Sequence, residues 1–334
     1  MTNNQLLGIH HVTAMTDDAE RNYKFFTEVL GMRLVKKTVN QDDIYTYHTF
    51  FADDVGSPGT DMTFFDFPHV PKGHSGTNSI TRPSFRVPDD AALAYYEARF
   101  NEYGVKHEGI QALFGKKVLP FEEPDGQSYQ LISDENNKGV APGQPWKKGP
   151  VPTDKAIYGL GPIEITVSYF EDFKKILEEI FGMRTIIEEE DVAVLEVGEG
   201  GNGGQVFLRK DTTAPEARQG YGEVHHVSFR LEDHEAISKW LEKYEQYGIG
   251  NSGLVDRFYF EALYARIGHI LVEVSTDGPG FMGDEPYETL GESLALPPFL
   301  EKKRDYIESE AVSYTHLTLP TNTVTCRSRW SPYH

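Results

Sequence analysis

Stretches of apolar residues at helical spacing alternate along the chain with stretches whose composition is typical of β-strands. The first helical stretch places four apolar residues on one face, namely Ala19, Tyr23, Phe26 and Leu30. Gly31 follows, at the position where helices often end in the left-handed conformation. Strands are expected before this helix, over residues 9–12, and after it, over residues 45–51 and 62–67. This part of the chain therefore forms one unit with the order strand, helix, further strands.

The same order recurs three more times, beginning near residues 84, 160 and 225. The later helices are expected to end before Gly104, Gly182 and Gly248. Four copies of about seventy residues indicate internal duplication, which outweighs any local assignment. We predict an α+β fold of four βαβββ units, paired in chain order into two similar domains, each around a curved, cup-like sheet.

Proline and glycine are dense between Lys138 and Pro152, which indicates a linker. We predict an N-terminal domain at residues 1–137, a linker at 138–154 and a C-terminal domain at 155–311. Residues 312–334 read like a translated sequencing adapter and contain the one cysteine of the chain, Cys326. We interpret this tail as non-native and exclude it from the fold.

The composition limits the classes of partner. The chain has 32 Lys and Arg against 52 Asp and Glu, a net charge of -20, which opposes binding to a nucleic-acid backbone. No run approaches the ~18 apolar residues of a membrane-spanning helix, and the N-terminus lacks a signal-peptide pattern. We expect a cytoplasmic protein that binds neither nucleic acid nor membrane. The sequence does not determine whether the chain forms a homo-oligomer.

Two matching histidine pairs are the strongest candidates for chemistry. His10-His11-Val12 recurs as His225-His226-Val227, and both segments lie in expected strands. Because successive strand side chains point to opposite faces, we expect each pair to offer one imidazole to each face of its sheet. Glu273, the one carboxylate in the apolar run 270–274, supplies a third ligand. Two imidazoles and one carboxylate, with positions left open, are typical of non-haem Fe(II), and Mn(II) accepts the same set.

The repeats predict one such site per chain, between units one and four. At the equivalent positions, unit three has Ile163-Glu164 in place of a histidine pair, and unit two has Gln130 in place of Glu273. Glu164 could hold a second metal, but no histidine accompanies it, which favours an outward-facing strand residue. We expect the metal in the C-terminal cup, reached by the histidine of the first strand, so unit one must lie against unit four.

Several motifs, taken in order, resemble those of a known family. They are His10-His11-Val12-Thr13, Phe50-Phe51-Ala52-Asp53, Gly56-Ser57-Pro58-Gly59-Thr60, Glu223-Val224-His225-His226, Arg257-Phe258-Tyr259-Phe260-Glu261, Glu273, Thr276-Asp277-Gly278-Pro279-Gly280-Phe281, Leu290-Gly291-Glu292 and Leu296-Pro297-Pro298. With the four βαβββ units, they resemble the vicinal-oxygen-chelate superfamily, which includes glyoxalase I and extradiol dioxygenases. The resemblance implies that the two α+β domains are glyoxalase-like. Over residues 6–310 the chain is similar to the two-domain ring-cleaving dioxygenases that act on hydroquinones.

This resemblance implies roles for eight residues. The metal ligands implied are the second histidine of each pair and the strand glutamate, namely His11, His226 and Glu273. The residues implied around them are Arg257, Tyr264, His10, His225 and Thr13. Of these, we assign Arg257 and Tyr264 to contacts with substrate or oxygen, while the other three flank the ligands.

The function implied is cleavage of a small aromatic diol of the hydroquinone type by O2, with Fe(2+) as cofactor and Mn(2+) as the alternative. Within enzymes, the alternatives are a catechol extradiol dioxygenase and a glyoxalase-like isomerase that uses Zn(II) or Ni(II). An isomerase would call for four protein ligands, commonly two carboxylates, and only one is evident. The non-enzymatic alternative is a protein that sequesters a quinone-like molecule without turnover. The metal ligands argue against it, because sequestration does not require a metal with an open coordination site.

Overall fold

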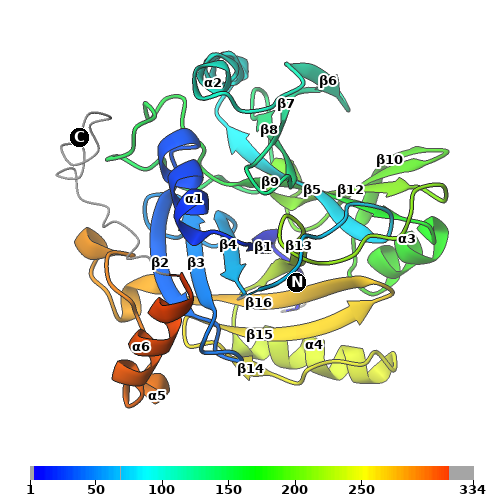
Figure 1. Cartoon of the computed structure of the whole chain (residues 1–334). Helices are drawn as coiled ribbons and strands as arrows, with labels where there is room; N and C mark the ends of the chain where they lie inside the picture. The colour runs from blue at the N-terminus through cyan, green and yellow to red at the C-terminus, as the bar shows by residue number, and fades with distance from the viewer. Residues whose placement is uncertain (1–3, 68, 316–334) are drawn as a thin grey trace.

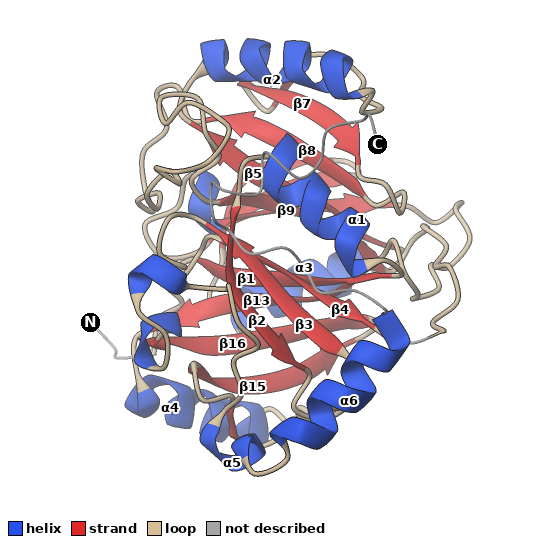
Figure 2. Cartoon of the chain, turned by 60° about the vertical axis from the view of Figure 1, so that its left-hand side comes forward, coloured by secondary structure: helices blue, strands red, loops and turns tan. Residues whose placement is uncertain are grey.

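Two eight-stranded β-sheets form the body of the molecule (Figures 1 and 2). The computed structural model describes residues 4–67 and 69–315. The first sheet has the order β14-β15-β16-β13-β1-β4-β3-β2. Its strands are β1 (Ile9–Thr16), β2 (Arg33–Val39), β3 (Tyr47–Ala52), β4 (Asp61–Asp66), β13 (Val224–Leu231), β14 (Val255–Asp256), β15 (Phe260–Ile267) and β16 (Ile270–Pro279).

The second sheet has the order β10-β11-β12-β9-β5-β8-β7-β6. Its strands are β5 (Ser79–Val87), β6 (Gln111–Leu113), β7 (Lys116–Glu122), β8 (Ser128–Ser133), β9 (Leu160–Val167), β10 (Arg184–Glu189), β11 (Val192–Glu196) and β12 (Gln205–Lys210). The helices are α1 (Ala19–Lys24), the π-helix η1 (Phe25–Val29), α2 (Asp90–Tyr103), α3 (Phe170–Glu179), α4 (His234–Gln246), α5 (Pro298–Glu301) and α6 (Arg304–Thr315). Three short 3₁₀ turns are η2 (Asn202–Gly204), η3 (Phe281–Gly283) and η4 (Tyr287–Thr289).

The prediction of four βαβββ units is confirmed. In each unit the helix follows the first strand, and the last strand returns to pair in parallel with the first, as β4 does with β1 and β16 with β13. Aspartates begin three of the helices: Asp18, Asp89 and Asp233 each accept a hydrogen bond from a backbone N–H in the first turn. The apolar periodicity and the capping residues in the sequence therefore determine where the helices of these units begin and end.

The units pair differently from the predicted chain order. β1 pairs antiparallel with β13, so units one and four share the first sheet, and β5 pairs antiparallel with β9, so units two and three share the second. Unit one thus lies against unit four, as expected, but the pairing of consecutive units into one cup is wrong. The reason is that the first strand of every unit keeps one open edge after pairing with its own last strand. The pattern within a unit does not say which partner fills that edge.

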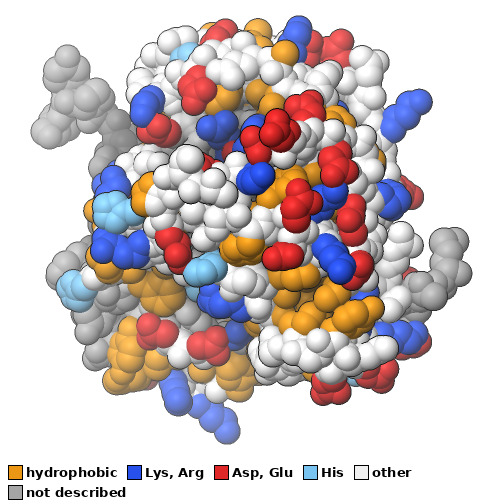
Figure 3. Space-filling model, turned by 90° about the vertical axis from the view of Figure 1, so that its right-hand side faces the viewer, with side chains coloured by type: hydrophobic (Ala, Val, Ile, Leu, Met, Phe, Trp, Pro, Cys, Tyr) orange, Lys and Arg blue, Asp and Glu red, His pale blue; other side chains and the backbone are white. Residues whose placement is uncertain are grey.

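The proposed linker runs between β8 and β9, and residues 134–159 contain no helix or strand. The boundaries at 137 and 155 stay a prediction. Of the tail proposed as non-native, residues 316–334 lie outside the described residues. Among the residues that the structure describes, no helix is long and apolar enough to cross a membrane. On the face drawn in Figure 3, acidic and basic side chains lie interspersed.

One large apolar core joins both sheets to the helices that cover them. It includes Ile9 of β1, Phe85 of β5, Tyr23 of α1 and Ile237 of α4. A separate cluster lies on the opposite face of the second sheet, because its members alternate along their strands with residues of the main core. Its buried members are Val118, Ile132, Val194 and Phe207. The second cup is therefore packed with apolar side chains.

Candidate metal centre

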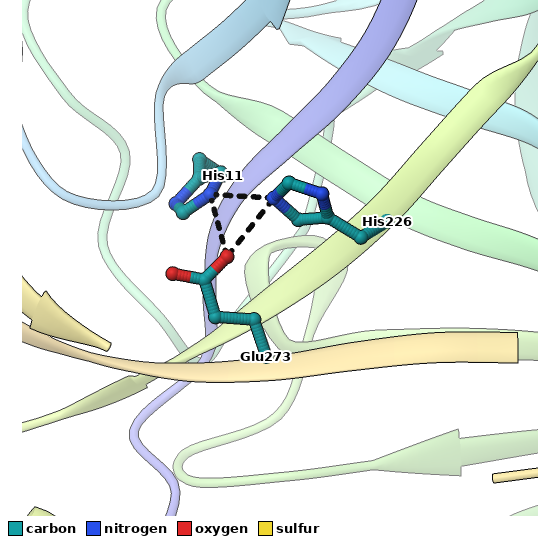
Figure 4. Close-up of side chains that lie close together, drawn as sticks. All are labelled: His11, His226 and Glu273. Carbon is teal, nitrogen blue, oxygen red and sulfur yellow. Dashed lines mark hydrogen bonds and ion pairs between the residues drawn. The ribbon is translucent and has the colours of Figure 1, made fainter. Parts of the chain in front are cut away.

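Three adjacent strands of the first sheet bring His11, His226 and Glu273 together. β13 lies between β1 and β16 in the sheet, and the backbone pairs Ser228 of β13 with both His11 and Glu273. Figure 4 shows the three side chains converging from their strands on one point. His226 and Glu273 come 215 and 262 positions after His11 in the sequence. The three residues meet because the strands of unit one extend the sheet of unit four.

The three side chains are close enough to share a metal ion. Glu273 Oε2 lies 3.2 Å from His11 Nε2 and 2.9 Å from His226 Nε2, and the two nitrogens are 3.2 Å apart. All three residues are buried, and among the described residues they are the one group of at least three His, Cys, Asp or Glu whose ligand atoms lie this close. Two imidazole nitrogens and a carboxylate oxygen suit a divalent first-row metal.

The Glu273 carboxylate fits such a site on its own chemistry. Its Oε1 accepts a hydrogen bond of 2.6 Å from the Ser275 hydroxyl, whereas the fully buried Oε2 accepts none and faces only the two imidazoles. Burial would raise the pKa of Glu273, but His11 and His226 hold it well below its ordinary value. A buried, ionised carboxylate with one oxygen free calls for a cation at this point.

His10 fixes the tautomer of His11. His10 Nε2 lies 3.1 Å from the carbonyl oxygen of Thr276, which can only accept, so Nε2 carries the proton. Burial and the neighbouring His11 lower the pKa of His10 to about 3, so its Nδ1 keeps a lone pair at neutral pH. His11 Nδ1, at 2.9 Å, must then be the donor, which leaves a lone pair on His11 Nε2, where a metal would bind.

The second pair repeats this arrangement. His225 Nδ1 lies 2.8 Å from His226 Nδ1. Burial, and to a smaller extent the neighbouring His226, lower the pKa of His225 to about 3. A neutral His225 can accept the Nδ1 proton of His226 and leave His226 Nε2 free. Each of the two facing imidazoles is thus oriented by the histidine that precedes it.

The expectation that the histidines of a pair face opposite sides of the sheet is wrong. The pairing of β1 with β13 shifts in register twice. Ile9 and His11 pair with the consecutive residues Phe229 and Ser228. The consecutive residues Thr13 and Ala14 pair with His226 and Val224. Each shift leaves one extra residue, His10 on β1 and His225 on β13, in a β-bulge. A bulge re-aims a side chain, and here it brings both rings of each pair into contact.

A cavity of about 460 Å³ opens beside the three candidate ligands, and His11 and His226 line it. Of the residues predicted to surround the metal, Arg257, Tyr264 and His225 line the cavity, while His10 and Thr13 do not. Thr13 is buried, and its hydroxyl lies 2.7 Å from that of Thr63. Thr13 therefore lies behind the cavity wall and not at its surface.

Arg257 and Tyr264 form one wall as a pair. Arg257 Nε donates to the Tyr264 hydroxyl at 3.3 Å, and Tyr264 stands opposite Glu273 in the register of β15 and β16. Burial raises the pKa of Tyr264 well above its ordinary value, so its hydroxyl stays protonated at neutral pH and can donate into the cavity. The guanidinium and the phenol thus place two donors on this wall.

Three other residues of the cavity are assigned no chemical role from the sequence, although His48 is expected at the surface or the rim of a pocket. His48 lies between the rings of Phe50 and Phe65, and its Nε2 is 2.9 Å from the Thr63 hydroxyl. Phe260 packs against His11, with ring centroids 5.3 Å apart, and Asp42 forms an ion pair with Arg257. Phe260 was within reach of sequence reasoning, since it lies in the motif that contains Arg257. Nothing in the local pattern marks Asp42.

The second cup has no such centre among its described residues. Glu164, at the position that corresponds to His11, forms an ion pair with Arg209. Gln130, which corresponds to Glu273, donates to the Ser84 hydroxyl at 2.9 Å. Glu164 thus has a cationic partner of its own, but the expectation that it faces outward is wrong, because it is buried beside Phe207.

Four βαβββ units, joined in pairs across two curled sheets, with a His-His-Glu cluster in one cup, define a chain of the glyoxalase-like class. The sequence profile of the Glyoxalase/Bleomycin resistance protein/Dioxygenase superfamily matches residues 8–131 and 159–275. The chain belongs to this superfamily.

Two curated relatives extend over nearly the whole chain. One, from Bacillus subtilis strain 168, is named as a presumptive ring-cleaving dioxygenase, MhqA; it is 45% identical over 309 residues, which are 91% of this chain and 97% of the relative. The other is a chlorohydroquinone/hydroquinone 1,2-dioxygenase from Sphingobium indicum, 28% identical over 307 residues, which are 89% of this chain and 94% of the relative.

Solved structures show the same architecture. A crystal structure of a presumptive dioxygenase from Bacillus subtilis superposes with a TM-score of 0.84 at 34% identity, over 92% of this chain and 97% of the other. Glyoxalase I from Zea mays superposes with a TM-score of 0.58 at 15% identity, over 81% and 92% of the two chains. The second similarity concerns the fold alone.

Proposed function

We propose that this protein is an Fe(II)-dependent dioxygenase that cleaves the ring of hydroquinone-type aromatic diols with O2. The observation that carries the proposal is the cluster of His11, His226 and Glu273 beside an aromatic-lined cavity with open space next to the ligands. The names of the two curated relatives support ring cleavage, and one of them acts on hydroquinones.

The reaction consumes one diol and one O2, and both oxygen atoms enter the opened ring, so no external reductant is needed. His11, His226 and Glu273 would hold the iron, or Mn(2+) in its place, since both accept this ligand set. When bound, the metal supplies Lewis acidity toward a phenolic oxygen and a path for electrons to O2. The chain itself must orient the ring, supply hydrogen-bond donors and exclude water.

The cavity walls suit these tasks. The rings of Phe50, Phe65 and Phe260 offer apolar and aromatic surface to a flat substrate. Tyr264, protonated and oriented by Arg257, can donate a hydrogen bond to oxygen atoms that gain negative charge during the reaction. His10 fixes the tautomer of His11, and a neutral His225 can accept the Nδ1 proton of His226, so that Nε2 of each ligand is free for the metal.

The test is oxygen uptake by protein loaded anaerobically with Fe(II), with Mn(II) or with no metal. The substrates are hydroquinone, methylhydroquinone and catechol, and the Glu273→Gln variant is the control. Iron-dependent uptake with the hydroquinones that fails in Glu273→Gln supports the proposal. Preference for catechol would place the enzyme among extradiol dioxygenases, and binding without uptake would favour sequestration. Isomerisation of a hemithioacetal without O2 would indicate a glyoxalase-like enzyme.

A further inference from the structure

The two outermost strands of the first sheet curl toward each other, and the segments that follow them meet at the cavity. Arg257 follows β14 directly, and Asp42 lies three residues beyond the end of β2. Asp42 Oδ2 accepts a hydrogen bond of 2.8 Å from Arg257 Nη2, and the Gln41 side-chain amide donates to the backbone oxygen of Arg257 at 2.9 Å. The edges of the sheet are thus joined at the cavity by an ion pair.

The two residues of this ion pair are the charged residues of the Lys, Arg, Asp and Glu types among the described residues of the cavity wall. Among the described residues that line the cavity, Arg257 is the one Lys or Arg, and Asp42 is the one Asp or Glu. The Arg257 side chain is 18% exposed, whereas that of Asp42 is 72% exposed. The guanidinium therefore faces the enclosed space, and the carboxylate that neutralises it comes from the solvent side.

The cavity has room for more than a bare ring. At about 460 Å³ it falls within the range of roughly 300–1,000 Å³ that holds drug-sized ligands, whereas hydroquinone has only about eight non-hydrogen atoms. Val39, Phe67 and Leu271 add apolar surface to this space. A ring substituent can therefore be accommodated, and its preferred chemistry depends on what the walls offer.

We propose that Asp42 determines substrate specificity, by occupying the guanidinium of Arg257 and so restricting the cavity to hydroquinones with neutral, apolar substituents. A carboxylated hydroquinone would need a cation for its carboxylate, and the one available on the wall is already paired with Asp42. It would also bring a second negative charge close to Asp42, which disfavours binding. This inference rests on the proposed function only for the identity of the ring.

Removing the charge of Asp42 should release this restriction. In Asp42→Asn the amide still fits beside Arg257, but the guanidinium keeps an uncompensated charge that a substrate carboxylate can pair with. The preference for methylhydroquinone over 2,5-dihydroxybenzoate should then fall by about tenfold or more, as expected when a charge-assisted contact is gained. Asp42→Glu keeps the charge and should keep the preference of the original protein.

The matched control is Asp43→Asn, which removes the same charge one residue away. The Asp43 carboxylate accepts hydrogen bonds from Tyr45 N and Thr46 Oγ1 and does not line the cavity. The measurement is the dissociation constant of each compound, determined without oxygen on Fe(II)-treated full-length protein and the three variants. No turnover is required, so the result does not depend on whether ring cleavage occurs.

The expected result is tighter binding of methylhydroquinone by the original protein, Asp42→Glu and Asp43→Asn, with the ratio reduced in Asp42→Asn alone. Equal ratios in Asp42→Asn and Asp43→Asn would overturn the inference, as would tighter binding of 2,5-dihydroxybenzoate by the original protein. The latter outcome would indicate that the carboxylate binds the metal directly. Oxygen uptake is measured separately, and its absence would refute the proposed dioxygenase while leaving the role of Asp42 in binding unaffected.

Discussion

Two candidate ligands of the metal centre, His11 and Glu273, are held by neighbours that are themselves constrained. The Thr276 carbonyl fixes His10, His10 fixes His11, and the Ser275 hydroxyl fixes the carboxylate of Glu273. Such outer contacts typically account for roughly 10–100-fold in metal affinity. Contacts within the chain therefore orient the candidate ligands.

His226→Ala should abolish tight metal binding, because it leaves one imidazole and one carboxylate. The loss should exceed the roughly 10–100-fold that is typical of outer contacts. The measurement is metal content after dialysis against a weak chelator, with His234→Ala, an exposed histidine of the same unit that is paired with Glu261, as control. Full iron occupancy in His226→Ala would remove His226 from the ligand set.

Tyr264→Phe should lower turnover while leaving metal content unchanged, because the hydroxyl faces the cavity and is not among the candidate ligands. Removal of one preorganised donor typically lowers turnover by roughly 10²–10³-fold. The measurement is the rate of oxygen uptake at saturating substrate, with Tyr247→Phe, an exposed tyrosine, as control. Unaltered turnover would contradict the role of Tyr264 as a donor.

The sequence predicts the candidate ligands better than their surroundings. His11 and His226 stand out because the same pattern occurs twice, and Glu273 because it interrupts an apolar strand. Asp42 has no such mark: it lies in a loop, and its role depends on two sheet edges that meet only after the whole sheet has curled. The orientation of the histidine pairs also escaped the pattern, since β-bulges suspend strict alternation.

At the scale of the element, helices follow from periodicity and their ends from capping. The helix expected to end before Gly104 is observed as Asp90–Tyr103, and Gly104 has the left-handed φ of 68°. The first helix departs from the prediction because its second half, Phe25–Val29, is a π-helix. Apolar spacing does not distinguish an α-turn from a π-turn over so short a length.

Asp233→Ala should lower the free energy of unfolding by about 1 kcal/mol, because the Asp233 carboxylate accepts the backbone N–H of Ala236 at the start of α4. Chemical denaturation measures this change. Glu242→Ala, on an exposed position in the middle of the same helix, is the control and should alter stability by less than about 0.5 kcal/mol. Equal effects of the two substitutions would argue against the cap.

At the scale of the whole molecule, the two cups have diverged. Both are built from two βαβββ units joined by their first strands, yet one encloses the candidate ligands and a cavity, and the other is filled. Phe207 stands beside Glu164 in the register of β12 and β9, so an apolar side chain lies next to the position that corresponds to His11. Units two and three therefore fill their cup with apolar side chains, and units one and four hold the candidate metal centre.

Phe207→Ala should lower the stability of the protein without affecting the candidate metal centre. Phe207 is buried in the cluster that fills the second cup, and truncation of a buried phenylalanine typically costs about 3–5 kcal/mol. Because the candidate metal centre belongs to the other sheet, metal content and oxygen uptake should persist below the shifted unfolding transition. Phe299→Ala, at an exposed phenylalanine of α5, is the control and should leave the transition nearly unchanged. Loss of metal from folded Phe207→Ala would show instead that the filled cup supports the centre, and that the two sheets do not act independently.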